Sequence, residues 1–162
     1  MKIFIPQGFL SAIKGKHLLL DTNFFIENDA TLVSIEPVQT EFLKGSPSED
    51  KYKIKAEYFE EIVSNFLPVT KDIFDNVREL TKMYKEEGKG VSIVDLLLGA
   101  SLIKYQKNLC LITKDIKDFP VNIFRRLTHF SLMGHRSIQS YGVYNYSQTS
   151  DKTGVDKDDI PF

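Results

Sequence analysis

Two apolar stretches of the sequence are followed by aspartate, a side chain that could do chemistry there. Asp21 follows three leucines in HLLLDTNFFI, and Asp115 and Asp118 come shortly after the run LCLIT. A carboxylate next to buried apolar residues is costly unless something pairs with it. Taken alone, Asp21 is equally consistent with an N-cap of the next helix and with a ligand at the carboxyl edge of a parallel sheet, where α/β proteins place their sites.

Two further acids lie in segments that we expect to be helical. Glu41 lies in VSIEPVQTEFLKG, where Pro37 is expected at the first helical position and Gly45 just past the helix end. By itself, Glu41 is consistent with a solvated residue at the margin of an apolar face. Asp95 follows Ser92 by three residues, which is capping-box spacing. Its neighbours belong to the most apolar helical segment, so we also expect Asp95 to point into a cleft.

The four segments together change the interpretation of these acids. If the strands before Asp21 and Asp115 are neighbours, four or five carboxylates converge at one sheet edge. Carboxylates packed together repel and raise one another's pKa, and a divalent cation relieves that repulsion. Ligands that are all oxygen favour Mg²⁺ or Mn²⁺. The three histidines do not have metal-site spacing: His17, His129 and His135.

The elements that must position these acids indicate an α/β fold. HLLLD and LCLIT are predicted as buried strands, and LPVT and THFSLM as short strands. Helical spacing of apolar residues predicts helices over 51–66, 71–86 and 93–106, after a polar connection at 46–52. Strands that alternate with helices favour βαβ units on a parallel sheet. The expected organisation is an N-terminal extension over 1–16, a domain over 17–145 and a polar tail over 146–162.

Composition limits the function classes. The 162 residues are 42% hydrophobic and 27% charged, as in one globular domain, and the net charge of −1 gives no overall basic field for nucleic acid. Cys110 is the only cysteine, so the chain has no disulfide framework or thiolate zinc site, and we expect a buried thiol. Because there is no signal peptide or 20-residue apolar run, we expect a cytoplasmic protein with no membrane segment.

These motifs, in this order and spacing, resemble the PIN domain, a family of metal-dependent nucleases that includes the VapC toxins. The similarity runs from about Leu18 to Met133 and depends on five stretches: LLLDTN, VQTEFLKG around Glu41, FLPVTKDIFDNVRELTK, SIVDLLLGASL around Asp95, and LCLITKDIKDF. It implies a PIN-like three-layer α/β/α fold with a central, mostly parallel sheet and an acidic site at the carboxyl edge of the strands.

The resemblance also implies a metal site and a reaction. The metal-binding and catalytic acids would be Asp21, Glu41, Asp95 and one or both of Asp115 and Asp118. Thr22, Asn23 and Thr113 would orient them. The reaction would be phosphodiester hydrolysis with Mg²⁺ or Mn²⁺, most often on RNA, with DNA as the alternative. Lys114 and Lys117 would contact substrate phosphates, unless they are ordinary solvated residues. A small antitoxin and a second copy of the chain are the partners that the family implies.

The last residues carry a second resemblance. DDIPF is similar to the C-terminal tip of bacterial single-stranded-DNA-binding protein, and it comprises Asp158, Asp159, Ile160, Pro161 and Phe162. The similarity implies docking onto replication and repair proteins. The alternatives are a merely solubilising acidic end or residues added to the natural chain. The rival function is therefore an interaction protein built on a PIN scaffold and recruited through this tail, or a DNA-directed PIN nuclease.

Overall fold

The computed structural model describes residues 17–20, 31–133 and 138–147. Four predicted site or tail elements fall elsewhere: the extension over 1–16, Asp21 with Thr22 and Asn23, the helix expected after them, and the DDIPF tip. They lie outside the described residues and remain predictions.

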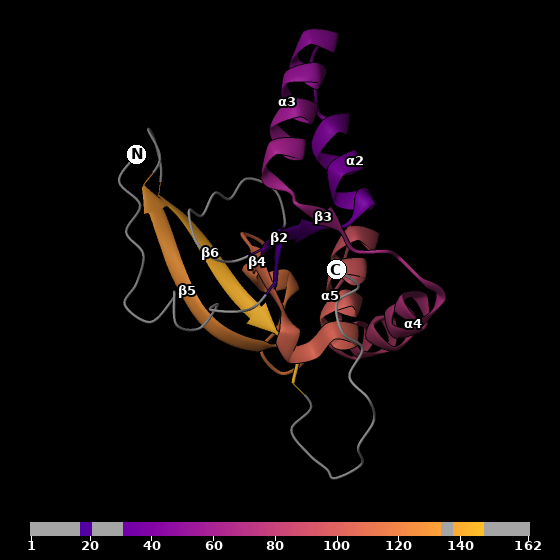
Figure 1. Ribbon diagram of the computed structural model, residues 1–162. Coiled ribbons are helices and arrows are strands. Elements are labelled where there is room, and N and C mark those ends of the chain that lie inside the picture. Colours follow the sequence, from indigo (N-terminus) through magenta and orange to yellow (C-terminus); the bar gives the residue numbers. More distant parts are fainter. Residues whose placement is uncertain (1–16, 21–30, 134–137, 148–162) are drawn as a thin grey trace.

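Six strands form one mixed sheet (Figure 1). Their bounds are β1 His17–Leu20, β2 Thr31–Ser34, β3 Asn65–Phe66, β4 Leu109–Thr113, β5 Arg125–Met133 and β6 Ile138–Asn145. The order is β3-β2-β1-β4-β6-β5, with parallel pairing from β3 to β4 and antiparallel pairing from β4 to β5. The α/β class is therefore confirmed. The sheet differs from the expected mostly parallel one, because its two longest strands form an antiparallel hairpin.

The strands that precede the two aspartate motifs are neighbours, which meets the condition under which their acids were expected to converge. β1 pairs in parallel with β4, and Leu20 is the partner of Ile112. Parallel strands bring their carboxyl ends to the same sheet edge. The last described residue before Asp21 therefore lies at the edge where β4 ends and where the segment with Asp115 and Asp118 begins.

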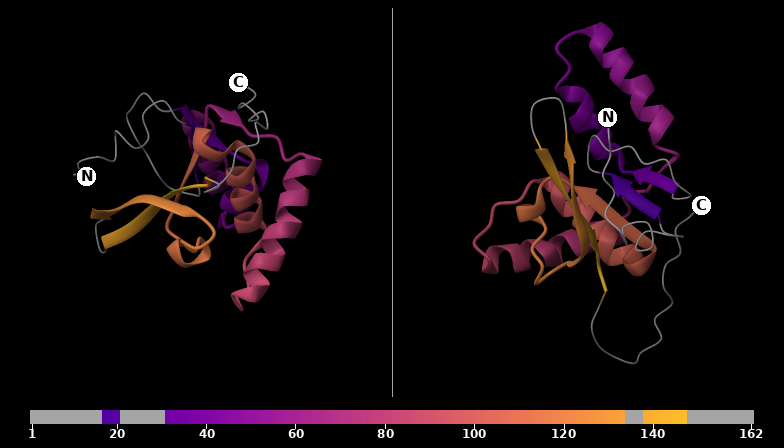
Figure 2. Two further views of the ribbon diagram at one scale, coloured as in Figure 1. Left: turned by 90° about the horizontal axis from the view of Figure 1, so that it is seen from below. Right: turned by 90° about the vertical axis from the view of Figure 1, so that its left-hand side faces the viewer.

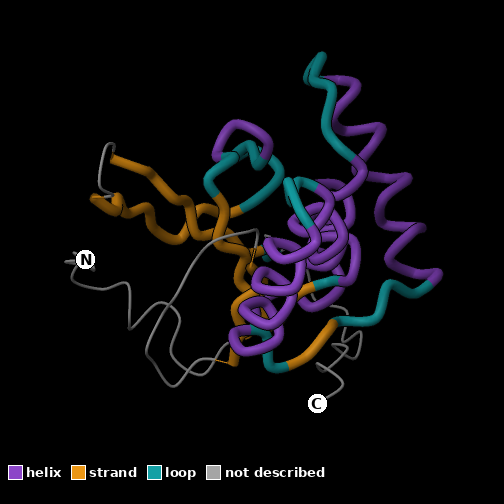
Figure 3. The backbone as a smooth tube through the Cα atoms, turned by 90° about the horizontal axis from the view of Figure 1, so that it is seen from above, coloured by secondary structure: helices purple, strands orange, loops and turns teal. Residues whose placement is uncertain are grey.

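Four α-helices are present in the described part of the chain: α2 Glu36–Lys44, α3 Glu49–Ile62, α4 Lys71–Glu86 and α5 Ile93–Tyr105. Single 3₁₀ turns follow at Gln106–Asn108 and Ile116–Asp118. Helices α4 and α5 lie side by side against the sheet, and α2 and α3 form a hairpin that extends away from it (Figures 1, 2 and 3). None of these helices has the length and hydrophobicity needed to cross a membrane.

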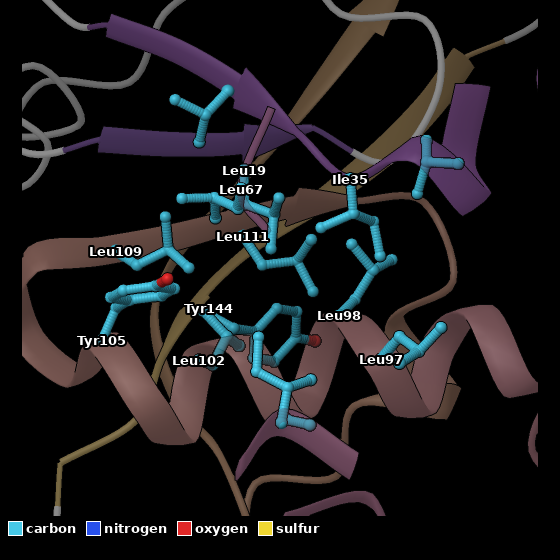
Figure 4. Packing of buried hydrophobic residues seen from close by; sticks show 14 of the residues in the cluster. Leu19, Ile35, Leu67, Leu97, Leu98, Leu102, Tyr105, Leu109, Leu111 and Tyr144 are labelled. Atoms are coloured by element: carbon cyan, nitrogen blue, oxygen red, sulfur yellow. The ribbon is translucent and has the colours of Figure 1, made fainter. Parts of the chain in front are cut away.

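The main core lies between α5 and one face of the sheet. Leu98 and Leu102 of α5 are fully buried and point toward the strands, where Leu19 and Leu111 are also fully buried (Figure 4). Complete burial of each leucine contributes about 1.5–3 kcal/mol. Because strand side chains alternate between faces, Cys110 lies on the opposite face, in a second cluster. The predicted burial of Cys110 is confirmed.

Several predicted elements match the structure closely. The helices expected after Pro37 and over 71–86 are α2 and α4, and the strand LCLIT is β4. The predicted helix over 93–106 ends at Tyr105. In α2, Pro37 occupies the first turn and Gly45 is the C-cap.

Other predicted elements need correction. The helix expected over 51–66 begins at Glu49 and ends at Ile62, because Ser48 caps it within the supposed polar connection, where the Ser48 hydroxyl accepts from the Lys51 N–H at 3.3 Å. The short strand is Asn65–Phe66 instead of LPVT. Strand β6, which no pattern indicated, is buried mainly through tyrosine, glycine and asparagine instead of aliphatic residues.

An ion pair joins α4 to α5. Lys104 Nζ lies 2.5 Å from Asp72 Oδ2 and donates to Thr70 Oγ1 at 3.2 Å, and the Thr70 hydroxyl donates to the Asp72 carboxylate. The hydrogen bonds from Lys104 and then Thr70 lower the pKa of Asp72 from 3.8 to about 2. A lowered pKa in the folded state means that the carboxylate stabilises the fold above about pH 4, and that this contribution disappears as the pH falls toward 2.

Substitution Lys104→Gln should therefore flatten the acid side of the stability profile. The free energy of unfolding, measured by urea denaturation between pH 2 and pH 5, should fall less toward low pH in the variant than in the wild type. The Asp72 side chain is 53% exposed, so we expect a difference below about 1 kcal/mol. Lys82→Gln removes an exposed pair with Glu79 and serves as control. Equal profiles for Lys104→Gln and the wild type would contradict this role of the pair.

Candidate acidic site

Asp95 lies in the first turn of α5 and is half-buried. The Ser92 hydroxyl accepts from the Asp95 N–H at 3.1 Å and donates to Asp95 Oδ2 at 2.6 Å. This reciprocal arrangement is a capping interaction that satisfies a free N–H at the helix start. The local interpretation of Asp95 is thus confirmed, and of its two carboxylate oxygens the cap uses Oδ2.

The charges around Asp95 show which acids converge on it. Burial raises the pKa of Asp95, the hydrogen bond from Ser92 lowers it, and the charges of Asp118, Asp115 and Glu41 raise it further. Glu41 belongs to α2, and Asp115 and Asp118 belong to the segment after β4. The structure nevertheless places all three near enough to Asp95 for their charges to raise its pKa.

Residues 114–119, which we call the acid loop, carry two of these carboxylates. The loop turns sharply because the Thr113 hydroxyl accepts from the Asp115 N–H at 3.0 Å, and the Asp118 N–H donates to the Asp115 carbonyl at 2.9 Å. Thr113 is fully buried at the end of β4. Its predicted supporting role is consistent with this contact to the backbone of Asp115.

Two tyrosines that were not predicted to belong to the site support the acid loop. The Tyr84 hydroxyl of α4 donates to the Asp118 carbonyl, and the Tyr144 hydroxyl of β6 donates to the Ile116 carbonyl at 3.3 Å. Burial raises the pKa of Tyr84, and the charges of Asp95 and Asp118 raise it further. The apolar stripe of α4 indicates a buried residue at position 84, but no local pattern identifies the partner of its hydroxyl.

Phe119 anchors the end of the acid loop in the core. Its side chain is fully buried, and its ring centroid lies 5.5 Å from that of Phe124 and 5.8 Å from that of Tyr144. Asp118 thus stands directly before a fixed residue and is half-buried, whereas Asp115 is exposed. Of the two aspartates, Asp118 has the more restricted position.

Glu41 lies on the wall of a groove between α2 and the start of α5. The groove has a volume of about 550 Å³ and is lined by Glu36, Pro37, Thr40, Glu41, Lys44, Ile93 and Val94. Glu41 itself is exposed. Of the four predicted site acids that the structure describes, Glu41 is the one that lines this groove.

The two lysines of the acid loop differ in their surroundings. Lys114 Nζ lies 5.6 Å from the ring centroid of Tyr141, which belongs to the second cluster on the other face of the sheet. Lys117 is exposed. Lys114 therefore already interacts with an aromatic ring, and Lys117 is the better candidate for a phosphate contact.

The converging acids do not form a complete metal site by themselves. Within residues 17–20, 31–133 and 138–147, no three histidine, cysteine, aspartate or glutamate side chains are arranged to hold one metal ion. Comparison of the chain with protein-family models, with curated proteins and with solved structures finds no match. The assignment of a function to this chain consequently depends on its own residues.

Proposed function

We propose that this chain is a metal-dependent nuclease of the PIN type, most similar in its motifs to the VapC ribonucleases. The observation that carries the proposal is the half-buried Asp95 carboxylate, on which three carboxylates from other parts of the chain act. The parallel pairing of β1 with β4 supports it, because Leu20, which directly precedes Asp21 in the sequence, lies at the sheet edge where the acid loop begins. The three-layer α/β/α arrangement of that family belongs to the proposal.

The unbalanced charge of these acids favours a cation as their partner. In the described part of the chain, none of the four carboxylates forms an ion pair with lysine or arginine. Like charges at short range destabilise the folded state unless a counter-charge is bound. The donors are all carboxylate oxygens, which suits Mg²⁺ or Mn²⁺ better than zinc or copper.

The donors fit such an ion in chemistry, though the described residues do not complete its coordination. The carboxylates of Asp95, Asp118 and Glu41 would supply ligands, and Asp21 would complete the set. A bound divalent ion lowers the pKa of a coordinated water and neutralises charge on a phosphodiester as it is cleaved. The groove beside Glu41 would admit the strand, and Lys117 would bind a neighbouring phosphate.

Cleavage of labelled RNA and DNA with Mn²⁺ tests this proposal. We expect the wild type to cut RNA, to lose activity with a chelator and to regain it when Mn²⁺ is restored. Asp118→Asn should lower the rate at least about tenfold, whereas Asp115→Asn, at an exposed position, should have the smaller effect. No cleavage of either nucleic acid by the folded wild type would contradict the proposal. Cleavage of DNA alone would support the proposed reaction but would show that the substrate is DNA instead of RNA.

A further inference from the structure

Two tyrosine hydroxyls from different elements hold the backbone of the acid loop. Tyr144 reaches it from the sheet and donates to the Ile116 carbonyl, and Tyr84 reaches it from α4 and donates to the Asp118 carbonyl. Ile116 and Asp118 are the first and last residues of the 3₁₀ turn in this loop, so the turn is held at both ends.

Of the two tyrosines, Tyr84 is the one whose hydroxyl contacts an acidic residue. It lies in the last turn of α4 with 3% of its surface exposed, and its ring is part of the main core. Its carbonyl partner belongs to Asp118 itself, whereas Tyr144 contacts a residue without a carboxylate. Helix α4 also packs against α5, which carries Asp95. One rigid side chain therefore links the helix pair that carries Asp95 to the backbone that carries Asp118.

We propose that Tyr84 is a positioning residue of the acidic site, whose hydroxyl fixes the Asp118 carbonyl and so restricts where the Asp118 carboxylate can lie. The inference rests on the proposed function, because the use of this geometry is to hold a divalent ion. Acids on loops are placed less precisely than acids on helices unless surrounding contacts fix them. The Tyr84 hydroxyl supplies such a contact, and phenylalanine at this position would fill the same space without it.

The first test is Mn²⁺ binding to the full chain, measured by electron paramagnetic resonance titration of the free ion. Tyr84→Phe should raise the dissociation constant about tenfold or more, as loss of a group that orients a metal ligand does. Tyr146→Phe is the matched control, because Tyr146 is half-buried and its ring packs 6.3 Å from that of Phe124. Equal Mn²⁺ affinity in Tyr84→Phe and the wild type would overturn the inference.

The second test asks whether Tyr84 acts through Asp118. Asp118→Asn changes the carboxylate and keeps the backbone carbonyl, so the two substitutions can be combined in a double-mutant cycle. If Tyr84 positions the Asp118 carboxylate, Tyr84→Phe should weaken Mn²⁺ binding less than twofold further in the Asp118→Asn background. A full tenfold loss in that background would show that Tyr84 acts by general stabilisation, and would overturn the positioning role.

A third measurement separates this inference from the proposed function. The Asp118 N–H is hydrogen-bonded within the loop, so its hydrogen exchange reports on loop order without any metal. Tyr84→Phe should speed exchange at Asp118 about tenfold, and Tyr146→Phe should not. A wild type that binds no Mn²⁺ would contradict the proposed nuclease, and the exchange rate would then decide alone whether Tyr84 fixes Asp118. Unchanged exchange would overturn that role.

Discussion

Replacing Asp95 with asparagine should raise the melting temperature of the metal-free protein and at the same time abolish the metal-dependent cleavage that we propose for it. Burial, followed in smaller part by the charges of Asp118, Asp115 and Glu41, raises the pKa of Asp95 in the folded state. A raised pKa means that the ionised carboxylate disfavours folding, so stability falls as the pH rises from about 4 through the folded pKa. Asparagine keeps the acceptor for the Ser92 hydroxyl and carries no charge.

The measurements are thermal unfolding with a chelator at pH 4 and pH 7, and cleavage with Mn²⁺ at pH 7. Asp95→Asn should melt higher than the wild type at pH 7 and should lose the decrease in stability between the two pH values. In a chain of this size, 1 kcal/mol corresponds to about 2–4 °C, which is easily measured. Cleavage should fall at least about 100-fold, beyond the effect expected for a group that only orients a ligand.

Manganese should reverse the order of the two melting temperatures. At 100 times its dissociation constant, a ligand stabilises the folded state by about 2.7 kcal/mol, a gain that the variant should largely lack. Asp75→Asn is the control, because Asp75 is an exposed aspartate of α4 that pairs with Arg78. If Asp95→Asn melts below the wild type without metal, the electrostatic account of this site is wrong. If it cuts as fast as the wild type, Asp95 is no metal ligand.

Gly142→Ala should destabilise the protein through a side chain that also supports the acid loop. A Cβ at Gly142 would lie 2.8 Å from Tyr144 Oη and 2.9 Å from Tyr144 Cζ. The Tyr144 ring is fully buried against Phe119, so it cannot move away without disturbing the core. Such overpacking costs about 1–3 kcal/mol, from which a gain of about 0.5–1 kcal/mol in backbone entropy must be subtracted.

The displaced ring would also carry its hydroxyl away from the Ile116 carbonyl, so Mn²⁺ affinity should fall together with stability. Urea denaturation and Mn²⁺ titration measure the two effects. Gly90→Ala is a matched control, since a Cβ there would meet nothing within 4 Å. Unchanged stability in Gly142→Ala would mean that the Tyr144 ring has room to move, and would contradict the close packing over Gly142.

The elements that could be predicted from the sequence are those that are specified by residues close together in the chain. Ile73, Val77, Leu80 and Tyr84 are buried at helical spacing, and they predict α4 with its full bounds. Ser92 and Asp95 predict the start of α5 through the capping box. The sequence does not indicate strand β6, because Val143 is the one aliphatic residue among its five buried positions, 141–145.

The part of the candidate site that the sequence predicts is the position of acids after apolar strands, as with Asp115 and Asp118 after β4. Two short, mainly apolar segments predict the strands β1 and β4, but their pairing is a property of the folded sheet that the sequence left open. The contact of Tyr84 with Asp118 joins residues that are 34 positions apart and depends on how α4 packs, so no sequence pattern reports it. The prediction for Asp21 remains open, because that residue lies outside the described residues.

The pairing of β1 with β4 also determines when the acidic site can exist during synthesis. His17 pairs with Leu109, so this ladder closes a loop that contains both Glu41 and Asp95. Contacts between residues so far apart in sequence form slowly in folding, because the intervening chain must first be ordered. A nascent chain that ends before Leu109 lacks the partner strand and the acid loop. Any activity of the site can therefore begin only after most of the chain has left the ribosome.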